Sequence, residues 1–305
     1  MKKDKYTKFS TITRIPCPHC SNLCSSNVQS CPKCGESLPD LKSSGKTLSP
    51  QKDEKYNEFN YLELLSAEIG KDIPLREKIK SNEVGYKIEN GKITGISLPG
   101  CRLKSLPPLH TPLPSLKVLF LNQNRFKTVP AEIKYMTSLE RLRLDHNQLE
   151  ILTSEINKNS TLRVLKLDSN NISEVPIMDS LESLEFLSLS RNNIKNIHNS
   201  IGFLSNLKYL NLRINKIERI PDSINFLINL KKLNLSSNDL KTIPENIGNL
   251  KSLEYLYLSN NNLKNLPRSL ANLIKLKELG LKGNFWITPP SFLKNLKAKG
   301  LIIKH

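Results

Sequence analysis

The most regular feature of this sequence is an apolar pattern that returns every 23 residues, with one interval of 22. Each unit reads L-x-x-L-x-L-x-x-N, and eight units follow one another from residue 116 to residue 284. Repetition at this period predicts a solenoid, because one such unit is too small to bury its apolar face and must stack on its neighbours. A solenoid offers an extended binding surface, but the repeat alone does not say what is bound.

Each unit predicts one strand followed by a turn. The x-L-x-L-x segment alternates as a strand does, so its leucines point inward and the residues between them point outward. The asparagine that closes the pattern is polar in an apolar interior and must therefore bond to backbone groups. Apolar–proline pairs such as Val129-Pro130 and Ile220-Pro221 follow and direct the chain away from the strand. We expect an α/β solenoid: a horseshoe with a parallel inner sheet, short helical or irregular outer turns, and a ladder of Asn124, Asn147, Asn170, Asn192, Asn215, Asn238, Asn261 and Asn284.

Residues 57–92 predict an N-terminal cap of the solenoid. Apolar residues at helical spacing run from Tyr61 to Ile69, and Gly70 fits the helix end. Asn90-Gly91 between two alternating apolar runs predicts a β-hairpin, since both turn residues need a positive φ.

Residues 93–305 hold the repeats and a C-terminal cap. Residues 93–115 read as a degenerate first repeat, in which Cys101 replaces the ladder asparagine and is expected in the core. The tail around residues 299–303 is expected to close the last coil, with Trp286 buried there.

Charge adds a second constraint. The net charge is +18, and residues 91–305 contain 31 of the 46 Lys and Arg residues but 16 of the 28 Asp and Glu residues. A domain this basic attracts nucleic acid, acidic proteins or anionic membranes. No apolar run approaches the roughly 18 residues of a membrane span. The charged start, without an apolar stretch behind it, predicts no signal peptide.

Four of the five cysteines within residues 17–38 predict a metal site. Cys17-Pro-His-Cys20 and Cys31-Pro-Lys-Cys34 are two C-x-x-C turns separated by ten residues. Two such turns suit one tetrahedral, structural Zn²⁺, which would also supply the folding free energy that so short a segment lacks. Cys24 and His19 are competing ligands, expected instead as a free thiol and a solvated ring. A redox C-x-x-C would need a βαβ surround that the sequence does not predict.

The flanking segments complete the N-terminal organisation. Residues 1–16 predict a basic leader and residues 39–56, rich in Ser, Pro and Lys, a flexible linker. Because the cysteines cluster in a metal motif and do not form disulfide-bonded caps, a reducing cytoplasm is the expected location.

These motifs carry resemblances to known families. Residues 233–250, LNLSSNDLKTIPENIGNL, resemble the intracellular 23-residue type of leucine-rich repeat, and residues 85–98 resemble the start of archaeal members. Residues 17–38 resemble a small zinc ribbon. The resemblance implies a protein partner bound on the concave face, such as a Ras-like GTPase or another signalling protein, and it implies no catalysis.

Outward strand positions supply the candidate binding residues. The first outward column largely alternates in sign, so its charges are expected to satisfy one another: Lys117, Glu140, Arg163, Glu185, Lys208, Lys231, Glu254 and Lys277. Aromatic and arginine side chains are common anchors of interfaces. We predict an aromatic cluster, interrupted by Lys232, that comprises Phe186, Tyr209, Tyr255 and Tyr257. We also predict a basic cluster beside Asp145 and Asp168 that comprises Arg141, Arg143, Arg163 and Lys166. Arg213 and Phe120 are two further candidate positions.

Catalysis is not predicted. The sequence contains no P-loop, nucleophile-elbow or H-E-x-x-H motif, and its five histidines are scattered. Asp145 and Asp168 could form an acid pair, but Arg143 and Lys166 are expected to neutralise them. The favoured function is a non-catalytic protein-binding scaffold. The alternative is a nucleic-acid-associated protein that uses the zinc ribbon and basic surface, which requires concentrated positive charge with stacking aromatics.

Overall fold

The computed structural model describes residues 14–16, 23–25, 58–109, 112–175, 177–285, 290–298 and 300–304. The chain divides into a small unit, mainly Met1–Tyr56, and a large unit that contains the repeats. In the small unit, β1 (Arg14–Pro16) pairs antiparallel with β2 (Leu23–Ser25), and Ile15 stands opposite Cys24. The strand β1 thus falls inside the predicted leader. The four predicted zinc ligands and Trp286 lie outside the described residues.

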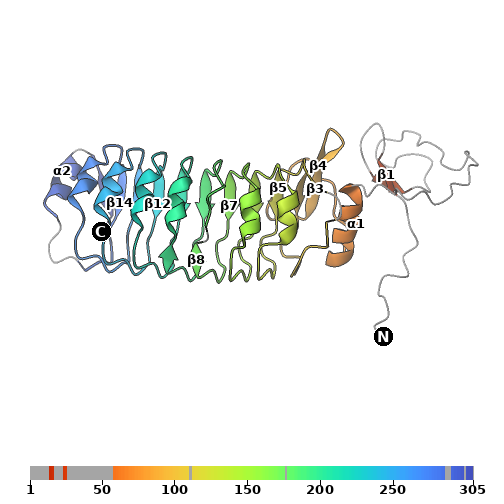
Figure 1. Ribbon diagram of the computed structural model, residues 1–305, viewed down its shortest axis with the longest axis horizontal. Helices are drawn as coiled ribbons and strands as arrows, with labels where there is room; N and C mark the ends of the chain where they lie inside the picture. Colours follow the sequence, from red (N-terminus) through yellow and green to blue (C-terminus); the bar gives the residue numbers. More distant parts are fainter. Residues whose placement is uncertain are drawn as a thin grey trace, which may run out of the picture. The chain divides into compact units, whose positions relative to one another are not determined.

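One sheet of eleven strands runs the length of the large unit, in the order β15-β14-β13-β12-β11-β9-β7-β6-β5-β4-β3. From β4 to β15 each strand pairs in parallel with the next, as predicted (Figure 1). The strands are β3 (Gly85–Glu89), β4 (Lys92–Ser97), β5 (Val118–Phe120), β6 (Arg141–Arg143), β7 (Val164–Lys166), β9 (Phe186–Ser188), β11 (Tyr209–Asn211), β12 (Lys232–Asn234), β13 (Tyr255–Tyr257), β14 (Glu278–Gly280) and β15 (Ile302–Lys304).

Leucines in register form the core beneath this sheet. Leu142 pairs with Leu119 on one side and Leu165 on the other, and all three are at most 1% exposed. The same register repeats along the sheet, so each coil buries its apolar stripe only against its neighbours.

The predicted asparagine ladder is present in all eight units. Asn215 is representative: its Nδ2 donates to the carbonyl of Leu189 in the preceding coil and to that of Leu212 in its own coil, each at 3.0 Å. Its Oδ1 accepts from the backbone N–H of Ile194 at 3.0 Å. Each ladder asparagine therefore fastens its coil to the coil before it. The first coil has no such predecessor, which explains why Cys101 is tolerated there.

Short 3-10 helices form the outer turns of six coils, and four of the six begin directly after a proline. They are η1 (Ala131–Tyr135), η2 (Ser154–Lys158), η3 (Asn199–Phe203), η4 (Asp222–Phe226), η5 (Glu245–Asn249) and η6 (Arg268–Asn272). The one 22-residue repeat forms bends and turns without a 3-10 helix in its described residues. It instead contributes β8 (Glu174–Val175), which pairs in parallel with β10 (Asn196–Ile197).

A helix and a hairpin precede the repeats, and a helix and a strand follow them. Helix α1 (Glu58–Ile69) begins three residues earlier than predicted and is followed by Gly70, whose φ is +67°. The hairpin turn residues Asn90 and Gly91 have φ values of +50° and +72°. At the other end, α2 (Phe292–Ala298) leads to β15, which adds to the sheet beside β14. One expectation is wrong: Cys101 is half-buried and not part of the core.

Candidate protein-binding surface

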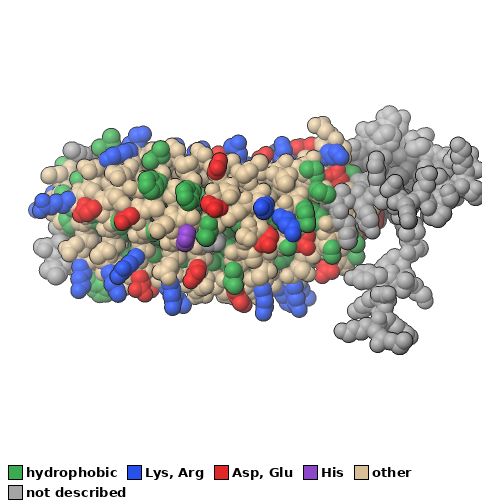
Figure 2. Space-filling model, in the orientation of Figure 1, with side chains coloured by type: hydrophobic (Ala, Val, Ile, Leu, Met, Phe, Trp, Pro, Cys, Tyr) green, Lys and Arg blue, Asp and Glu red, His purple; other side chains and the backbone are tan. Residues whose placement is uncertain are grey.

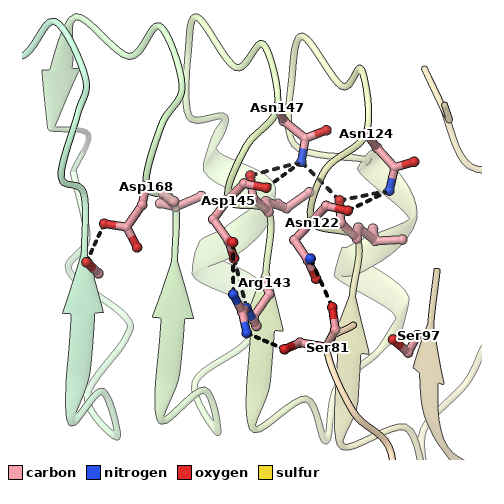
Figure 3. A network of polar contacts seen from close by, with 12 residues as sticks. Ser81, Ser97, Asn122, Asn124, Arg143, Asp145, Asn147 and Asp168 are labelled. Carbon is pink, nitrogen blue, oxygen red and sulfur yellow. Dashed lines mark hydrogen bonds and ion pairs between the residues drawn. The ribbon is translucent and has the colours of Figure 1, made fainter. Parts of the chain in front are cut away.

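The N-terminal cap occupies the first part of the inner sheet face (Figure 3). The hydroxyl of Ser97 donates to the carbonyl of Lys80 at 2.8 Å, and the Nδ2 of Asn122 donates to the carbonyl of Ser81 at 3.0 Å. The guanidinium of Arg143 donates to the Ser81 hydroxyl at 2.5 Å. Residues 80 and 81 are therefore tied to three successive coils, beginning at β4, β5 and β6. This end of the face is therefore covered by the chain itself, and the sheet from β7 onward is not part of these contacts.

Arg143 contributes to this closure and not to an open basic cluster. Its Nε and Nη2 donate to the two carboxylate oxygens of Asp145 at 2.8 and 2.9 Å. Its guanidinium also lies 5.9 Å from the ring centroid of Phe120, which is only 8% exposed. The expectation that Phe120 faces a partner is therefore wrong, and the predicted basic cluster loses Arg143 to an internal ion pair.

Asp168 is satisfied in a way that the sequence did not predict. Its Oδ1 accepts from the hydroxyls of Ser188 and Ser190 at 2.5 and 2.6 Å and from the Ser190 backbone N–H at 2.9 Å. The ammonium of Lys166, the expected partner, instead lies 5.3 Å from the ring centroid of Phe186. Asp145 and Asp168 thus form no acid pair suited to catalysis: one is bound to arginine and the other to serines.

Charges in the first outward column pair across neighbouring coils, as predicted. Glu185 binds both Arg163 at 3.1 Å and Lys208 at 2.6 Å, while Glu254 binds Lys277 at 2.6 Å. These cations lower the pKa values of both carboxyl groups. The side chains are largely exposed, so each pair contributes little to stability, but together they use up the acidic groups of the column.

Aromatic rings follow at the second outward position. The rings of Phe186 and Tyr209 stack with centroids 4.3 Å apart and planes 2° apart. Lys166 covers one end of this stack and Lys232, 5.5 Å from the centroid of Tyr209, covers the other. The stack and the charged column border a hollow of about 390 Å³ whose lining includes Arg141. One face of each ring is therefore in contact with the other ring, and both residues remain partly exposed.

Lys232 joins the two halves of the aromatic cluster, where the sequence suggested that it interrupts them. Its ammonium lies 5.5, 5.8 and 5.2 Å from the ring centroids of Tyr209, Tyr255 and Tyr257. A cation over aromatic faces is attracted by about 0.5–2 kcal/mol, more strongly where it is shielded from water. The four predicted aromatic residues and Lys232 thus form one continuous group across β9, β11, β12 and β13, which we call the aromatic row.

The end of the aromatic row is fixed in place by its neighbours. Burial and the adjacent Glu278 raise the pKa of Tyr257 to about 12. The carboxylate of Glu278 is held by Lys304 at 2.6 Å, and hydrogen bonds from Lys304 and Tyr257 lower its pKa. A Cβ on Gly280 would stand 3.1 Å from Cδ1 of Tyr257, so the glycine leaves room for the ring. The position of the tyrosine ring is therefore set by contacts within the chain.

Two asparagines and an arginine border the aromatic row. The Oδ1 of Asn211 accepts from the backbone N–H of Arg213 at 3.2 Å, and the Oδ1 of Asn234 accepts from that of Ser236 at 3.1 Å. The guanidinium of Arg213 is exposed and has no ion pair among the described residues. Of the predicted site residues, Phe186, Tyr209, Tyr255 and Tyr257 come together, Arg141, Arg163 and Lys166 adjoin them, and Arg213 stands beyond Asn211.

Other classes of site find no support in the described part of the chain. No cluster of three or more His, Cys, Asp or Glu residues there could hold a metal ion. Its helices are all too short or too polar to cross a membrane.

Comparison with known families agrees with this geometry. Profiles described as leucine rich repeat match residues 92–149 and 182–240, and one described as leucine-rich repeat region matches residues 222–298. The repeats of this chain are leucine-rich repeats. Among curated proteins, no sequence matches significantly.

Three solved structures illustrate the likeness. A leucine-rich repeat protein of Leptospira interrogans is 32% identical, with a TM-score of 0.53, over 63% of this chain and 55% of that one. The plant peptide hormone receptor RGFR1 in complex with RGF2 is 28% identical, with a TM-score of 0.52, over 57% and 29%. The ectodomain of the receptor kinase GASSHO1/SCHENGEN3 from Arabidopsis thaliana, in complex with CASPARIAN STRIP INTEGRITY FACTOR 2, is 26% identical, with a TM-score of 0.57, over 67% and 29%. The chain thus spans about half the length of the first and under a third of the others.

Two features of the surface were missed from the sequence. Lys232 was read as an interruption because its side-chain direction is not visible in a pattern of letters. The closure by residues 80 and 81 was missed because Ser81 is 62 residues from Arg143 in the chain. A serine next to a predicted hairpin carries no signal for such a contact.

Proposed function

We propose that this protein is a non-catalytic scaffold that binds a protein partner on the aromatic row of its concave sheet face. Leucine-rich repeats in general serve as protein-binding scaffolds. The observation that carries the proposal is the continuous contact of Phe186, Tyr209, Lys232, Tyr255 and Tyr257 on the open part of the face. Pre-positioned aromatic side chains bind with little loss of conformational entropy, which favours them as interface anchors.

Two of the similar structures support a peptide or protein as the ligand, since one is a peptide hormone receptor in complex with RGF2 and the other is a receptor kinase ectodomain in complex with an integrity factor. The resemblance to intracellular repeats suggests a small GTPase or another signalling protein for this chain, and a cytoplasmic location. Its Cys17, Cys20, Cys31 and Cys34 are proposed to hold one structural Zn²⁺, and the support for this is their spacing, because they lie outside the described residues.

The nucleic-acid alternative receives less support. Figure 2 shows basic and acidic side chains interspersed over one long side of the molecule. On the concave face, the rings of Phe186 and Tyr209 stack on each other, and Lys166 and Lys232 lie over this stack. Base stacking on exposed ring faces supplies much of single-strand binding, and rings already stacked on each other offer less area for it.

Affinity capture with the full chain tests the proposal. The wild-type protein is compared with the triple variant Tyr209→Ala/Tyr255→Ala/Tyr257→Ala, at two salt concentrations and after nuclease treatment. The control is Phe203→Ala/Phe226→Ala, which removes two exposed rings from η3 and η4, each 62% exposed. We expect a defined protein that survives nuclease and is lost only with the tyrosine variant. Equal capture by the tyrosine variant, or recovery that is dominated by nucleic acid and falls steeply with salt, would refute it.

A further inference from the structure

We propose that the partner of the aromatic row is an acidic protein segment, one of whose carboxylates binds the ammonium of Lys232. This inference rests on the proposed function and adds the chemistry of the partner. It begins with the carboxylates of the open face, which are all engaged within the chain. Glu140, Glu185, Glu254 and Glu278 each pair with a lysine or arginine, Glu140 at 4.0 Å from Lys117, and Asp168 binds two serines. The face therefore has no spare acidic group to receive a basic partner.

Several hydrogen-bond donors of the same face, unlike its carboxylates, have no partner among the described residues. Lys232 is half-buried, its ammonium lies over three rings, and within the described residues no oxygen accepts a hydrogen bond from it. Its carboxylate neighbour Glu278 is already bound by Lys304. An ammonium has three donors and no acceptor, so a partly buried one favours an anionic oxygen. The Nδ2 of Asn234, one strand position further on, also lacks an acceptor in this part of the chain, as does the side chain of Arg213.

These unpaired donors lie beside aromatic rings. The combination fits a segment whose carboxylates accept from the donors and whose apolar atoms pack against the rings. A phosphate backbone fits less well. The lysine and arginine side chains beside the row are already paired with Glu185 and Glu254, so the donors that remain at Lys232, Asn234 and Arg213 do not form the continuous positive groove that a phosphate backbone requires. Isolated side-chain carboxylates need only these separate donors. The charge pattern thus favours an acidic peptide over nucleic acid.

A matched pair of variants isolates the charge of Lys232. Lys232→Met keeps the stem of the side chain and removes the ammonium. Lys241→Met removes the same charge from an exposed position outside the row, where the ammonium lies 3.9 Å from Glu218. Both variants should melt near the wild-type temperature, which is checked first. The full-length wild type and both variants are then used to select binders from a random dodecapeptide display library.

We expect Asp and Glu to be enriched in peptides selected on the wild type and on Lys241→Met, but not on Lys232→Met. For one selected peptide, Lys232→Met should weaken binding about tenfold, as the loss of a partly shielded charge-assisted bond does. Replacing its critical acidic residue by the amide should weaken wild-type binding equally and leave Lys232→Met binding unchanged, as a double-mutant cycle requires.

Three results would overturn the inference: no acidic enrichment, equal binding by Lys232→Met, or tighter and Lys232-dependent binding of a dT20 oligonucleotide. The two proposals fail differently. If non-acidic peptides are selected and the triple tyrosine variant loses them, protein binding on the aromatic row stands and the acidic partner falls. If the selected peptides bind the triple tyrosine variant as well as the wild type, both proposals fall.

Discussion

The rings of Phe186 and Tyr209 lie parallel on neighbouring strands, with their centroids 4.3 Å apart. Parallel in-register strands bring these side chains together because equivalent positions of successive coils stand about 4.8 Å apart. The spacing of the fold thus allows a ladder of rings and cations along one column, which Lys232 extends at one end, while Lys166 of the neighbouring column lies 5.3 Å from the centroid of Phe186. A repeat protein can in this way align rings from successive coils into one surface.

Removal of either stacked ring should reveal their coupling. Phe186→Ala and Tyr209→Ala should each lower the free energy of unfolding, and the double variant should lower it by less than the sum, with a coupling of about 0.5–1.5 kcal/mol. Urea unfolding of the four proteins measures this difference. Tyr209→Phe is the control, since it keeps the ring and should leave the stack unchanged. Strict additivity of the two alanine variants would mean that the rings do not interact.

The hydroxyl of Tyr257 should ionise at a higher pH than that of an ordinary tyrosine. Burial and the neighbouring Glu278 raise its pKa to about 12. A raised folded-state pKa contributes stability that is complete below the unfolded value of about 10 and is lost as the pH rises from there through about 12. The absorbance titration of wild type minus Tyr257→Phe should therefore show its step near 12, and Glu278→Gln should move that step downward. A step near 10 would show that the ring is not held as described.

Replacing a ladder asparagine should lower the free energy of unfolding far more than replacing an exposed asparagine. Asn238 bonds to the carbonyls of Leu212 and Leu235 and accepts from the N–H of Ile217. Asn238→Ala leaves these buried backbone groups unpaired, so we expect it to cost about 2–3 kcal/mol of unfolding free energy. Asn229→Ala removes one exposed bond, to the carbonyl of Ser205, and should change it by less than about 0.5 kcal/mol. Similar losses for both variants in urea unfolding would count against the ladder as a coil fastener.

The cysteine motif predicts one tightly held zinc ion for each chain. Metal analysis of the purified full-length protein should find one equivalent of zinc, and Cys17→Ser/Cys31→Ser should remove it, because a tetrahedral site that loses two of its four thiolates no longer binds strongly. Cys24→Ser is the control, since that residue is not a predicted ligand. An absence of zinc, or equal loss in the Cys24 variant, would show the assignment to be mistaken.

Features set by the repeat could be predicted from the sequence, and features set by contacts between distant residues could not. The parallel sheet, the asparagine ladder and the Lys208–Glu185 ion pair follow from spacing and charge alone. The burial of Phe120 does not, because it depends on the position of the Arg143 side chain, whose guanidinium lies 5.9 Å from the ring centroid. Asn159 is a further case: it is fully buried at an outer-turn position and bonds to carbonyls of the preceding coil. The sequence pattern alone gives no reason to expect a buried asparagine at this position.

Side-chain footprinting of the complex is the most direct test of the central claim. The full-length protein, alone and with the protein that it captures, is exposed to hydroxyl radicals, and the oxidation of individual tyrosine and phenylalanine side chains is quantified. The account predicts protection of Tyr209, Tyr255 and Tyr257, with no change at Phe203 and Phe226 on the 3-10 helices. Protection of Phe203 and Phe226, with the three tyrosines oxidised as in the free protein, would place the partner on the outer turns and contradict it.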